Sequence, residues 1–300
     1  MELQQLLKRN KPDSSEKTMK EYISNLNLLY KNMTGNKGFN MEEFNKFTTD
    51  ELVECVNKHG ATKSHSYTRN MLSALKAYSG DKTLTKPITA AALAEKENYE
   101  NREASESTKS HHLTPEFIEQ KYKELEARSI PLWTKKDWNM EDFQNLQEWI
   151  MYNLVCGKYI APRRSQDWIH LKLRNINLDT DNYIDGKTFV FNQFKTSKHM
   201  GRQVIPIPDE LYRIIRQWVR FNQLDYMFVT AELKPLTSNS FGQKLNHIMG
   251  VKAGRTGGYG TNNWRHIYLT NKYANTIDLE DDMEAMGSSI GCAKCYIKKV

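Results

Sequence analysis

The stretch NYIDGKTFVFNQFKTSKHMGRQVIPIP, residues 182–208, carries the only clear strand pattern in the chain. Two runs rich in aromatic and β-branched residues flank Asp185-Gly186, a dipeptide that favours the tight turn of a β-hairpin. A second turn, over residues 197–201, leads to a third strand-like run over residues 202–207. We therefore expect a small antiparallel β-sheet at this point in the chain.

Helical spacing of apolar residues dominates the rest of the chain, so the expected fold class is mainly α with a small sheet, or α+β. Before the sheet, the pattern is helical over residues 113–160, with a break at Ser129-Ile130-Pro131. After the sheet, we expect helices that begin at Pro208-Asp209-Glu210, that span residues 237–249 and 262–275, and that carry Tyr296 in a last turn.

The N-terminal part also has a helical pattern. A helix is expected to begin near Asp13-Ser14-Ser15-Glu16, a second to run from a Thr48–Glu51 capping pair to Gly60, and a third to span Ser64 to Ser79. The expected organisation is a flexible basic arm over residues 1–12, a helical domain over 13–80, a linker over 81–112 and a second domain over 113–300.

The composition narrows the class of protein. Lys and Arg exceed Asp and Glu by 43 to 36 in 300 residues, a net charge of +7 that suits a partner rich in phosphate. The 4 cysteines are too few and too scattered for a secreted disulfide scaffold. We see no signal peptide and no apolar run long enough to span a membrane. These features predict an intracellular protein with no membrane partner.

A set of cationic residues and a late tyrosine stands out against this background. Cutting a phosphodiester with a side-chain nucleophile requires cations on the non-bridging oxygens and an acid for the leaving oxygen. Arginine suits the first task because its planar guanidinium binds two oxygens at once, and lysine suits the second. The chain offers these groups, without need of a metal, in Arg163-Arg164, Lys195, Arg265 and Tyr296.

The order and spacing of this set resemble those of the tyrosine recombinases, the lambda-type phage integrase superfamily. Arg164 with Asp167 resembles the first arginine box of the family, and Arg163 is the second choice. Lys195-Thr196 before the 202–208 strand resembles the family's hairpin lysine, with Lys198 as the alternative. The other matching segments are Asn262-Asn263-Trp264-Arg265-His266 and Met286-Gly287-Ser288-Ser289 ahead of Tyr296.

The resemblance implies a site-specific DNA recombinase or integrase that works through a 3′-phosphotyrosyl intermediate. Residues 13–80 would be the core-binding (SAM-like) domain and residues 113–300 the catalytic domain. The implied catalytic residues are Tyr296, Arg164, Lys195 and Arg265, with Asn262, Ser288 and His266 as auxiliary candidates. The residues expected to bind DNA are Arg163, Lys198, Arg202 and Arg69. The implied partners are double-stranded DNA and further copies of the chain, as a dimer or tetramer, with no cofactor and no metal.

Two positions depart from the family pattern, since Asn262 and Ser288 stand where the family has histidines. Neither side chain takes up a proton near neutral pH, so slow strand cleavage is expected. The alternatives are a catalytically weakened DNA-binding relative and a type IB-like topoisomerase. The replacement of these histidines and the consecutive arginines Arg163 and Arg164 resemble recombinases of large DNA viruses and their mobile elements. The protein would then act in the host nucleus or a viral factory, or in the cytoplasm or nucleoid if it is prokaryotic.

Other residues compete for these roles. Tyr259, Tyr268 and Tyr273 are rival nucleophiles, but the last two share a helix with Arg265 and are expected to pack. His266 neighbours Arg265 on that helix and therefore points elsewhere, which favours a structural role. Cys292 and Cys295 resemble half a zinc site, but no second pair completes it.

Overall fold

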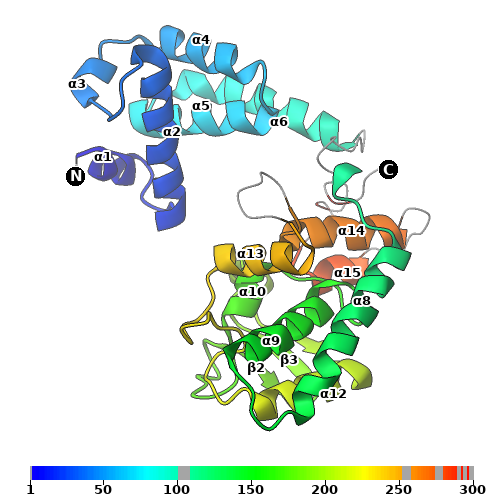
Figure 1. Cartoon of the computed structure of the whole chain (residues 1–300). Helices are drawn as coiled ribbons and strands as arrows, with labels where there is room; N and C mark the ends of the chain where they lie inside the picture. Colours follow the sequence, from blue (N-terminus) through cyan, green and yellow to red (C-terminus); the bar gives the residue numbers. More distant parts are fainter. Residues whose placement is uncertain are drawn as a thin grey trace. The chain divides into compact units, whose positions relative to one another are not determined.

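The computed structural model divides the chain into two compact units, residues 1–101 and 102–300, and it describes residues 2–100, 109–251, 258–273, 280–288, 292 and 296 (Figure 1). The first unit is all helical. Its elements are α1 (Glu2–Asn10), α2 (Glu16–Thr34), α3 (Met41–Phe44), α4 (Thr49–Gly60), α5 (His65–Ser79), η1 (Lys82–Leu84) and α6 (Thr85–Glu100).

Local capping explains why several of these helices begin where the sequence predicted. Thr48 caps α4 in a full capping box with Glu51, and Ser64 and Ser15 cap α5 and α2 through their side chains. Gly80 ends α5 in the left-handed conformation, with φ of 70°, which costs a glycine little. These three predicted helices are confirmed.

Two predictions for this unit are wrong. The segment expected to be a flexible arm forms α1, because Leu7 is fully buried in the core of the unit. The first part of the expected linker forms η1 and α6, with Leu84 buried in the same core. Pro87 does not break α6 because it lies in the first helical turn, where no backbone donor is needed. Of the expected linker, residues 101–108 lie outside the described part of the chain.

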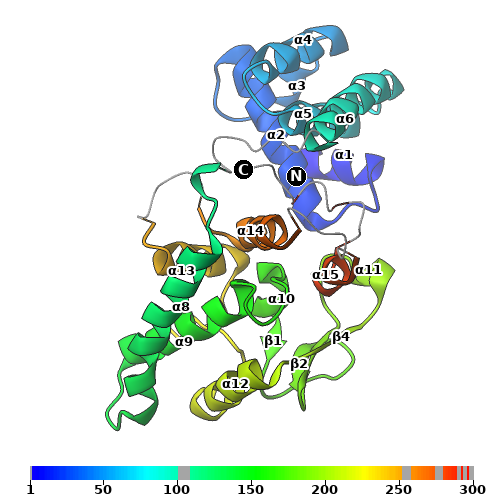
Figure 2. The same cartoon turned by 90° about the vertical axis from the view of Figure 1, so that its right-hand side faces the viewer.

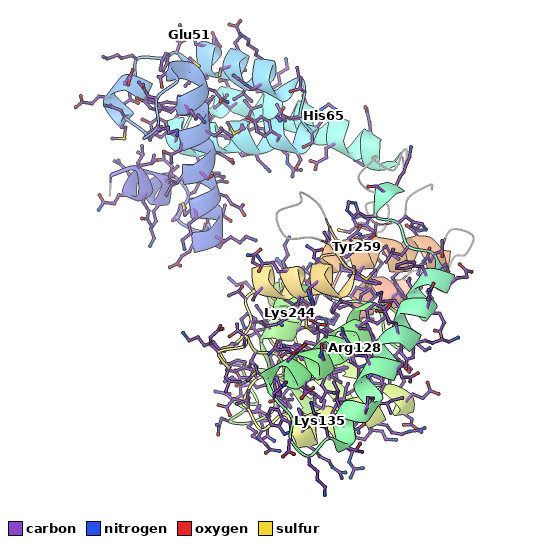
Figure 3. The ribbon with its side chains drawn as sticks, in the orientation of Figure 1. Glu51, His65, Arg128, Lys135, Lys244 and Tyr259 are labelled. Carbon is purple, nitrogen blue, oxygen red and sulfur yellow. The ribbon has the colours of Figure 1, made fainter. Side chains whose placement is uncertain are left out.

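The second unit is built around α9 (Met140–Val155), whose residues from Leu146 to Val155 are all buried. The other helical elements are α8 (Pro115–Ser129), η2 (Ile130–Thr134), α10 (Ser165–Ile169), α11 (Ser197–Met200), α12 (Asp209–Phe221), α13 (Ser238–Ile248), α14 (Thr261–Tyr273) and α15 (Glu280–Ala285). Glu148 of α9 ties two neighbours to the core, since it accepts hydrogen bonds of 2.9 Å from Arg128 of α8 (Figure 3) and 2.9 Å from His247 of α13.

A 4-stranded sheet with the order β1-β2-β3-β4 lies beside these helices. Its strands are β1 (Leu171–Lys172), β2 (Asn182–Asp185), β3 (Thr188–Phe191) and β4 (Gln203–Pro206). The predicted hairpin is confirmed, with Tyr183 opposite Val190 and Val190 opposite Val204. The sheet is mixed and not purely antiparallel as the sequence led us to expect, because β1 pairs with β2 in parallel.

The connection between β3 and β4 also differs from the expected turn. It contains the short helix α11, which ends at Gly201 with a φ of 68°. Figure 2 shows α11 next to α15. Gln203, which follows, donates a hydrogen bond of 2.9 Å to the backbone carbonyl of Glu284 in α15. This contact brings the segment after the hairpin to the segment that precedes Tyr296.

Candidate active site

Arg265 and Tyr296 lie in direct contact at the centre of the candidate site. The Nη1 atom of Arg265 donates a hydrogen bond of 2.6 Å to the phenol oxygen of Tyr296, and its guanidinium carbon lies 4.4 Å from the centre of the tyrosine ring. Arg265 is fully buried and Tyr296 is 9% exposed. A permanently charged group at such a depth is costly unless partners hold it, so its position calls for a chemical role.

The guanidinium of Arg265 keeps donors to spare. Its Nε and Nη2 atoms are buried and have no hydrogen-bond partner among the described residues. Burial lowers the pKa of Arg265; the neighbouring Tyr296 opposes this effect, and the charge of Arg164 adds to it. An anion next to these donors would relieve both the unpaired donors and the repulsion between the two arginines.

The backbone of Tyr296 is also held by α14. His266 donates from Nδ1 to the carbonyl oxygen of Tyr296 at 2.9 Å, and Thr270 donates to the same oxygen at 3.3 Å. The His266 and Tyr296 rings lie 4.9 Å apart. His266 therefore contacts both the backbone and the ring of Tyr296, and does not point away from it as the sequence led us to expect.

Arg164 stands at the N-cap of α10 and is only partly buried. Its Nη1 atom donates a hydrogen bond of 2.9 Å to the backbone carbonyl of Gly287. The charge of Arg164 acts on both Arg265 and Asp167, so the two arginines share one electrostatic environment. Arg164 is thus placed near the Arg265–Tyr296 pair with part of its guanidinium open to a ligand.

Arg163 has a different environment, and its assignment to DNA binding needs correction. It is 1% exposed, and its Nε atom donates to the carboxylate of Asp167 at 2.8 Å. Its guanidinium also lies 4.1 Å from the centre of the Phe191 ring and donates to the carbonyl of Ala285. A side chain buried and paired in this way holds α10, the sheet and α15 together and presents no surface to DNA.

The carbonyl of Gly287 connects the first arginine to the lysine segment. It accepts the hydrogen bond of Arg164 and a second one, of 3.0 Å, from the hydroxyl of Thr196. Gly287 has a φ of 65°, and a Cβ at this position would lie 3.1 Å from Nη2 of Arg163. Only glycine fits here without strain, which gives a physical reason for the glycine after Met286. Thr196 and Gly287 both belong to segments that match the family pattern, but the sequence does not reveal the hydrogen bond between them.

Lys195 precedes Thr196 and is exposed. It lies after the end of β3, in the connection to α11, and not on a strand. No contact joins its amine to Arg164, Arg265 or Tyr296 among the described residues. The structure therefore brings the neighbour of Lys195 to the site and leaves the lysine side chain in solvent.

The auxiliary candidates separate into two kinds. Asn262 is exposed on α14, whereas Ser288 is 4% exposed and its amide bonds to the carbonyl of Met283 at 2.8 Å. Of the expected DNA contacts, Lys198 is exposed on α11 and Arg202 is exposed just before β4, where it donates to the phenol of Tyr183 at 3.1 Å. Arg69, in the first unit, pairs with Glu95 at 2.6 Å.

The rival tyrosines are engaged elsewhere. Tyr268 donates to the carboxylate of Asp282 at 2.7 Å, and Tyr273 donates to the same carboxylate. Burial, followed by the bond to Asp282, raises the pKa of Tyr268 far above its usual value, which disfavours a phenolate there. Tyr259 packs at the edge of the His111 ring, beside α14 (Figure 3). Asp282, which sequence reasoning missed, joins α15 to α14 through these contacts.

The described residues contain no cluster of His, Cys, Asp or Glu that could hold a metal ion. Cys292 is exposed, and Cys295 lies outside the described part of the chain. In the described segments, no helix is long and apolar enough to cross a lipid bilayer.

Comparison of the whole chain with solved structures identifies its architecture. A Tn1549 transposon integrase in complex with transposon right-end DNA aligns with a TM-score of 0.58 and 13% identity, over 99% of this chain and 95% of that one. A XerH site-specific recombinase bound to a palindromic difH substrate, in a post-cleavage complex, aligns with a TM-score of 0.57 and 15% identity, over 93% and 75%. The chain has the tyrosine-recombinase fold.

A lambda integrase dimer bound to a core site shares this fold, with a TM-score of 0.56 and 16% identity over 98% of this chain and 76% of the integrase. No family model and no curated protein matches the sequence. The likeness is thus one of fold alone, because no identity exceeds 16% in these comparisons. Within the tyrosine-recombinase fold, the roles of individual residues have to be argued from this chain.

Proposed function

We propose that this protein is a site-specific DNA recombinase or integrase that cuts and rejoins DNA through a 3′-phosphotyrosyl intermediate. The observation that carries the proposal is the buried contact of 2.6 Å between Arg265 and the phenol of Tyr296. It supports the proposal because a phenol in contact with a guanidinium suits a nucleophile next to a phosphate-binding group, inside a fold shared with DNA recombinases.

In this reaction Tyr296 attacks the scissile phosphorus and releases its phenolic proton to solvent water. Arg164 and Arg265 bind the non-bridging oxygens, on which negative charge increases in the transition state. Lys195 protonates the 5′-oxygen as its bond to phosphorus breaks. Because Lys195 is exposed without DNA, we propose that it closes onto the site when DNA binds. The phosphotyrosyl bond conserves the energy for rejoining.

The proposed substrate is double-stranded DNA at a specific site, cut by several copies of the chain assembled on it. The dimer of lambda integrase on a core site and a lambda integrase tetramer on a Holliday junction support such an assembly. We also propose that the DNA is that of a virus or mobile element, which the pattern of Arg163-Arg164, Asn262 and Ser288 favours.

The test is a suicide DNA substrate, nicked near the scissile phosphate so that the cleaved fragment diffuses away. The unchanged chain is expected to form a covalent adduct that resists denaturation, and Tyr296→Phe is expected to form none. Tyr268→Phe is the matched control, because Tyr268 is bound to Asp282, and it is expected to retain the adduct. Adducts that survive Tyr296→Phe would contradict the choice of nucleophile.

The second candidate function is a catalytically weakened DNA-binding relative. The exposed Asn262 and the buried Ser288 favour it, because neither can exchange a proton near neutral pH. DNA binding without an adduct over a wide pH range would select this function. Relaxation of supercoiled DNA that lacks paired sites would instead select a topoisomerase.

A further inference from the structure

An arginine-rich face of α12 lies apart from the candidate active site. In both Figure 1 and Figure 2, α12 lies at the opposite end of the second unit from α14, which carries Arg265. α12 packs on the core through Leu211, Ile215 and Trp218. Its other face is exposed and is not explained by the proposed reaction.

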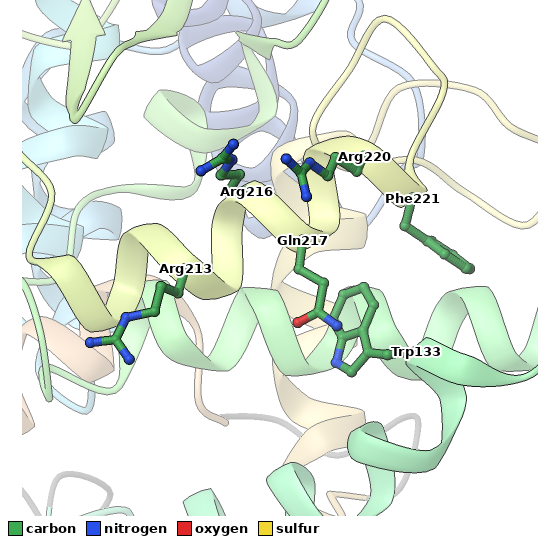
Figure 4. A pocket seen from close by; sticks show the side chains of 6 residues that line it. All are labelled: Trp133, Arg213, Arg216, Gln217, Arg220 and Phe221. Carbon is green, nitrogen blue, oxygen red and sulfur yellow. The ribbon is translucent and has the colours of Figure 1, made fainter.

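This face lines a surface hollow with a volume of about 690 Å³ (Figure 4). The lining residues are Trp133, Arg213, Arg216, Gln217, Arg220 and Phe221. The three arginines are spaced by three and four residues, so they form one stripe about 10 Å long on the helix. Like charges at this spacing repel one another and destabilise a helix that has no counter-charge.

Within the described part of the chain, no acidic side chain forms an ion pair with the stripe, although the charge of Asp209 acts on Arg213. Arg213, Arg216 and Arg220 form no ion pair there, and the nearby Asp209 bonds to Lys187 at 2.6 Å. Elsewhere in the second unit, Arg128 and Arg163 are both paired with carboxylates. The stripe is therefore a local excess of guanidinium groups, which suits an anionic partner.

Aromatic side chains lie next to the stripe. Trp133 and Trp138 both contact Phe221, with ring centres 5.8 Å and 5.1 Å apart, and Trp138 is 46% exposed. The remaining tryptophans, Trp149, Trp168, Trp218 and Trp264, are buried. The exposed indole of Trp138 and the half-buried indole of Trp133, beside arginines, combine a stacking surface for bases with groups that bind phosphates.

We propose that this surface, formed by the α12 arginines with Trp133 and Trp138, binds single-stranded nucleic acid. Unpaired bases would stack on the indoles while Arg216 and Arg220 bind the adjacent phosphates. Single strands fit better than duplex DNA, because a duplex hides its base faces and needs a longer basic track than these few arginines provide. The proposal goes beyond strand cleavage and does not depend on it.

The test measures binding of a fluorescein-labelled oligo-thymidylate of about 12 nucleotides to the full chain by anisotropy. The double variant Arg216→Glu with Arg220→Glu is expected to raise the Kd at least about tenfold. The matched control, Lys123→Glu with Lys234→Glu, makes the same charge change at two exposed lysines outside α12 and is expected to change the Kd less than about twofold. Equal effects in the two variants would overturn the proposal.

Two further readouts identify the ligand. Unlabelled oligo-thymidylate is expected to quench tryptophan fluorescence, and Trp138→Leu is expected to remove most of the quenching. Quenching that persists in both Trp138→Leu and Trp133→Leu would overturn the stacking surface. A duplex of the same length that binds as tightly as the oligo-thymidylate would overturn the assignment to single strands. Poly-glutamate that competes as strongly as unlabelled oligo-thymidylate would overturn it too. The poly-glutamate result would point to an acidic protein instead. Adduct formation on the suicide duplex separates this proposal from the catalytic one, because it is expected to be unchanged in the α12 variant.

Discussion

Arg265 donates one hydrogen bond to the phenol of Tyr296, over 2.6 Å, while its Nε and Nη2 atoms have no partner among the described residues. One guanidinium therefore holds the phenol of Tyr296, the proposed nucleophile, and still offers donors on its other sides. A phosphate at these free donors would lie beside the phenol oxygen. The contact accounts for the choice of arginine, because lysine has no second set of donors in a fixed plane.

Arg265→Lys is expected to reduce covalent adduct formation about 100- to 1000-fold, the size of effect seen when a transition-state donor is lost. The charge is kept, so the loss would report the missing guanidinium geometry. Single-turnover cleavage of the suicide substrate measures it. Arg128→Lys, at an arginine paired with Glu148, is the control and should cleave normally. Normal cleavage by Arg265→Lys would show that charge alone suffices.

Arg163 and Arg164 are expected to fail in different ways when each is changed to methionine. Arg163→Met leaves Asp167 buried without its cation, which should cost about 3–5 kcal/mol of the free energy of unfolding. Arg164→Met should cost less than about 2 kcal/mol, because this side chain is partly exposed and makes one bond to Gly287. Denaturant unfolding measures both values.

Adduct formation completes this comparison. Arg164→Met is expected to lose cleavage while it stays folded, whereas Arg163→Met is expected to lose stability first. A stable Arg163 variant that cannot cleave, next to an Arg164 variant that cleaves normally, would exchange the roles of the two arginines.

Thr196→Val is expected to slow cleavage about 3- to 10-fold, because it removes one hydrogen bond, of 3.0 Å, to the carbonyl of Gly287. We propose that Thr196 positions Lys195, its neighbour in the chain, through this bond. Thr196→Ser keeps the hydroxyl and should restore the rate. If Lys195 is the acid, a substrate with a better leaving group than the 5′-hydroxyl should mask the Thr196→Val defect. An unmasked defect would mean that Thr196 does not act through Lys195.

The Asp282 contacts predict how stability depends on pH. Burial raises the pKa of Asp282, but the bonds from Lys272, Tyr273 and Tyr268 outweigh it and leave the pKa below its usual value. A carboxyl group with a lowered pKa stabilises the folded state above its unfolded pKa, and this stabilisation is lost as pH falls through the folded value. The loss is expected on the acid side of about pH 4.

Asp282→Asn is expected to flatten that part of the stability profile and to reduce stability at neutral pH. Thermal unfolding between about pH 3 and pH 7 measures both effects. Asp137→Asn is the matched control, since its carboxylate is exposed and forms no hydrogen bond or ion pair with a described residue. An Asp282→Asn profile that runs parallel to that of the unchanged chain would contradict the role of this carboxylate.

The sequence alone was enough for features that depend on neighbouring residues. The helices after Thr48 and Ser64 follow from caps within three residues of the helix start, and the hairpin follows from Asp185-Gly186 between two strand-like runs. The ordered set of Arg164, Lys195, Arg265 and Tyr296 was also visible, because motif spacing is a property of the chain itself.

The tertiary structure decided what depends on contacts between distant segments. α1 and η1 form because Leu7 and Leu84 are buried in a core that no local pattern reveals. The roles of Arg163 and Arg164 separate because adjacent side chains leave the backbone in different directions, one toward Asp167 and the other toward Gly287. The bond from Thr196 to Gly287 and the contact between Arg265 and Tyr296 span 91 and 31 residues of chain, so only the packing of the folded unit could create them.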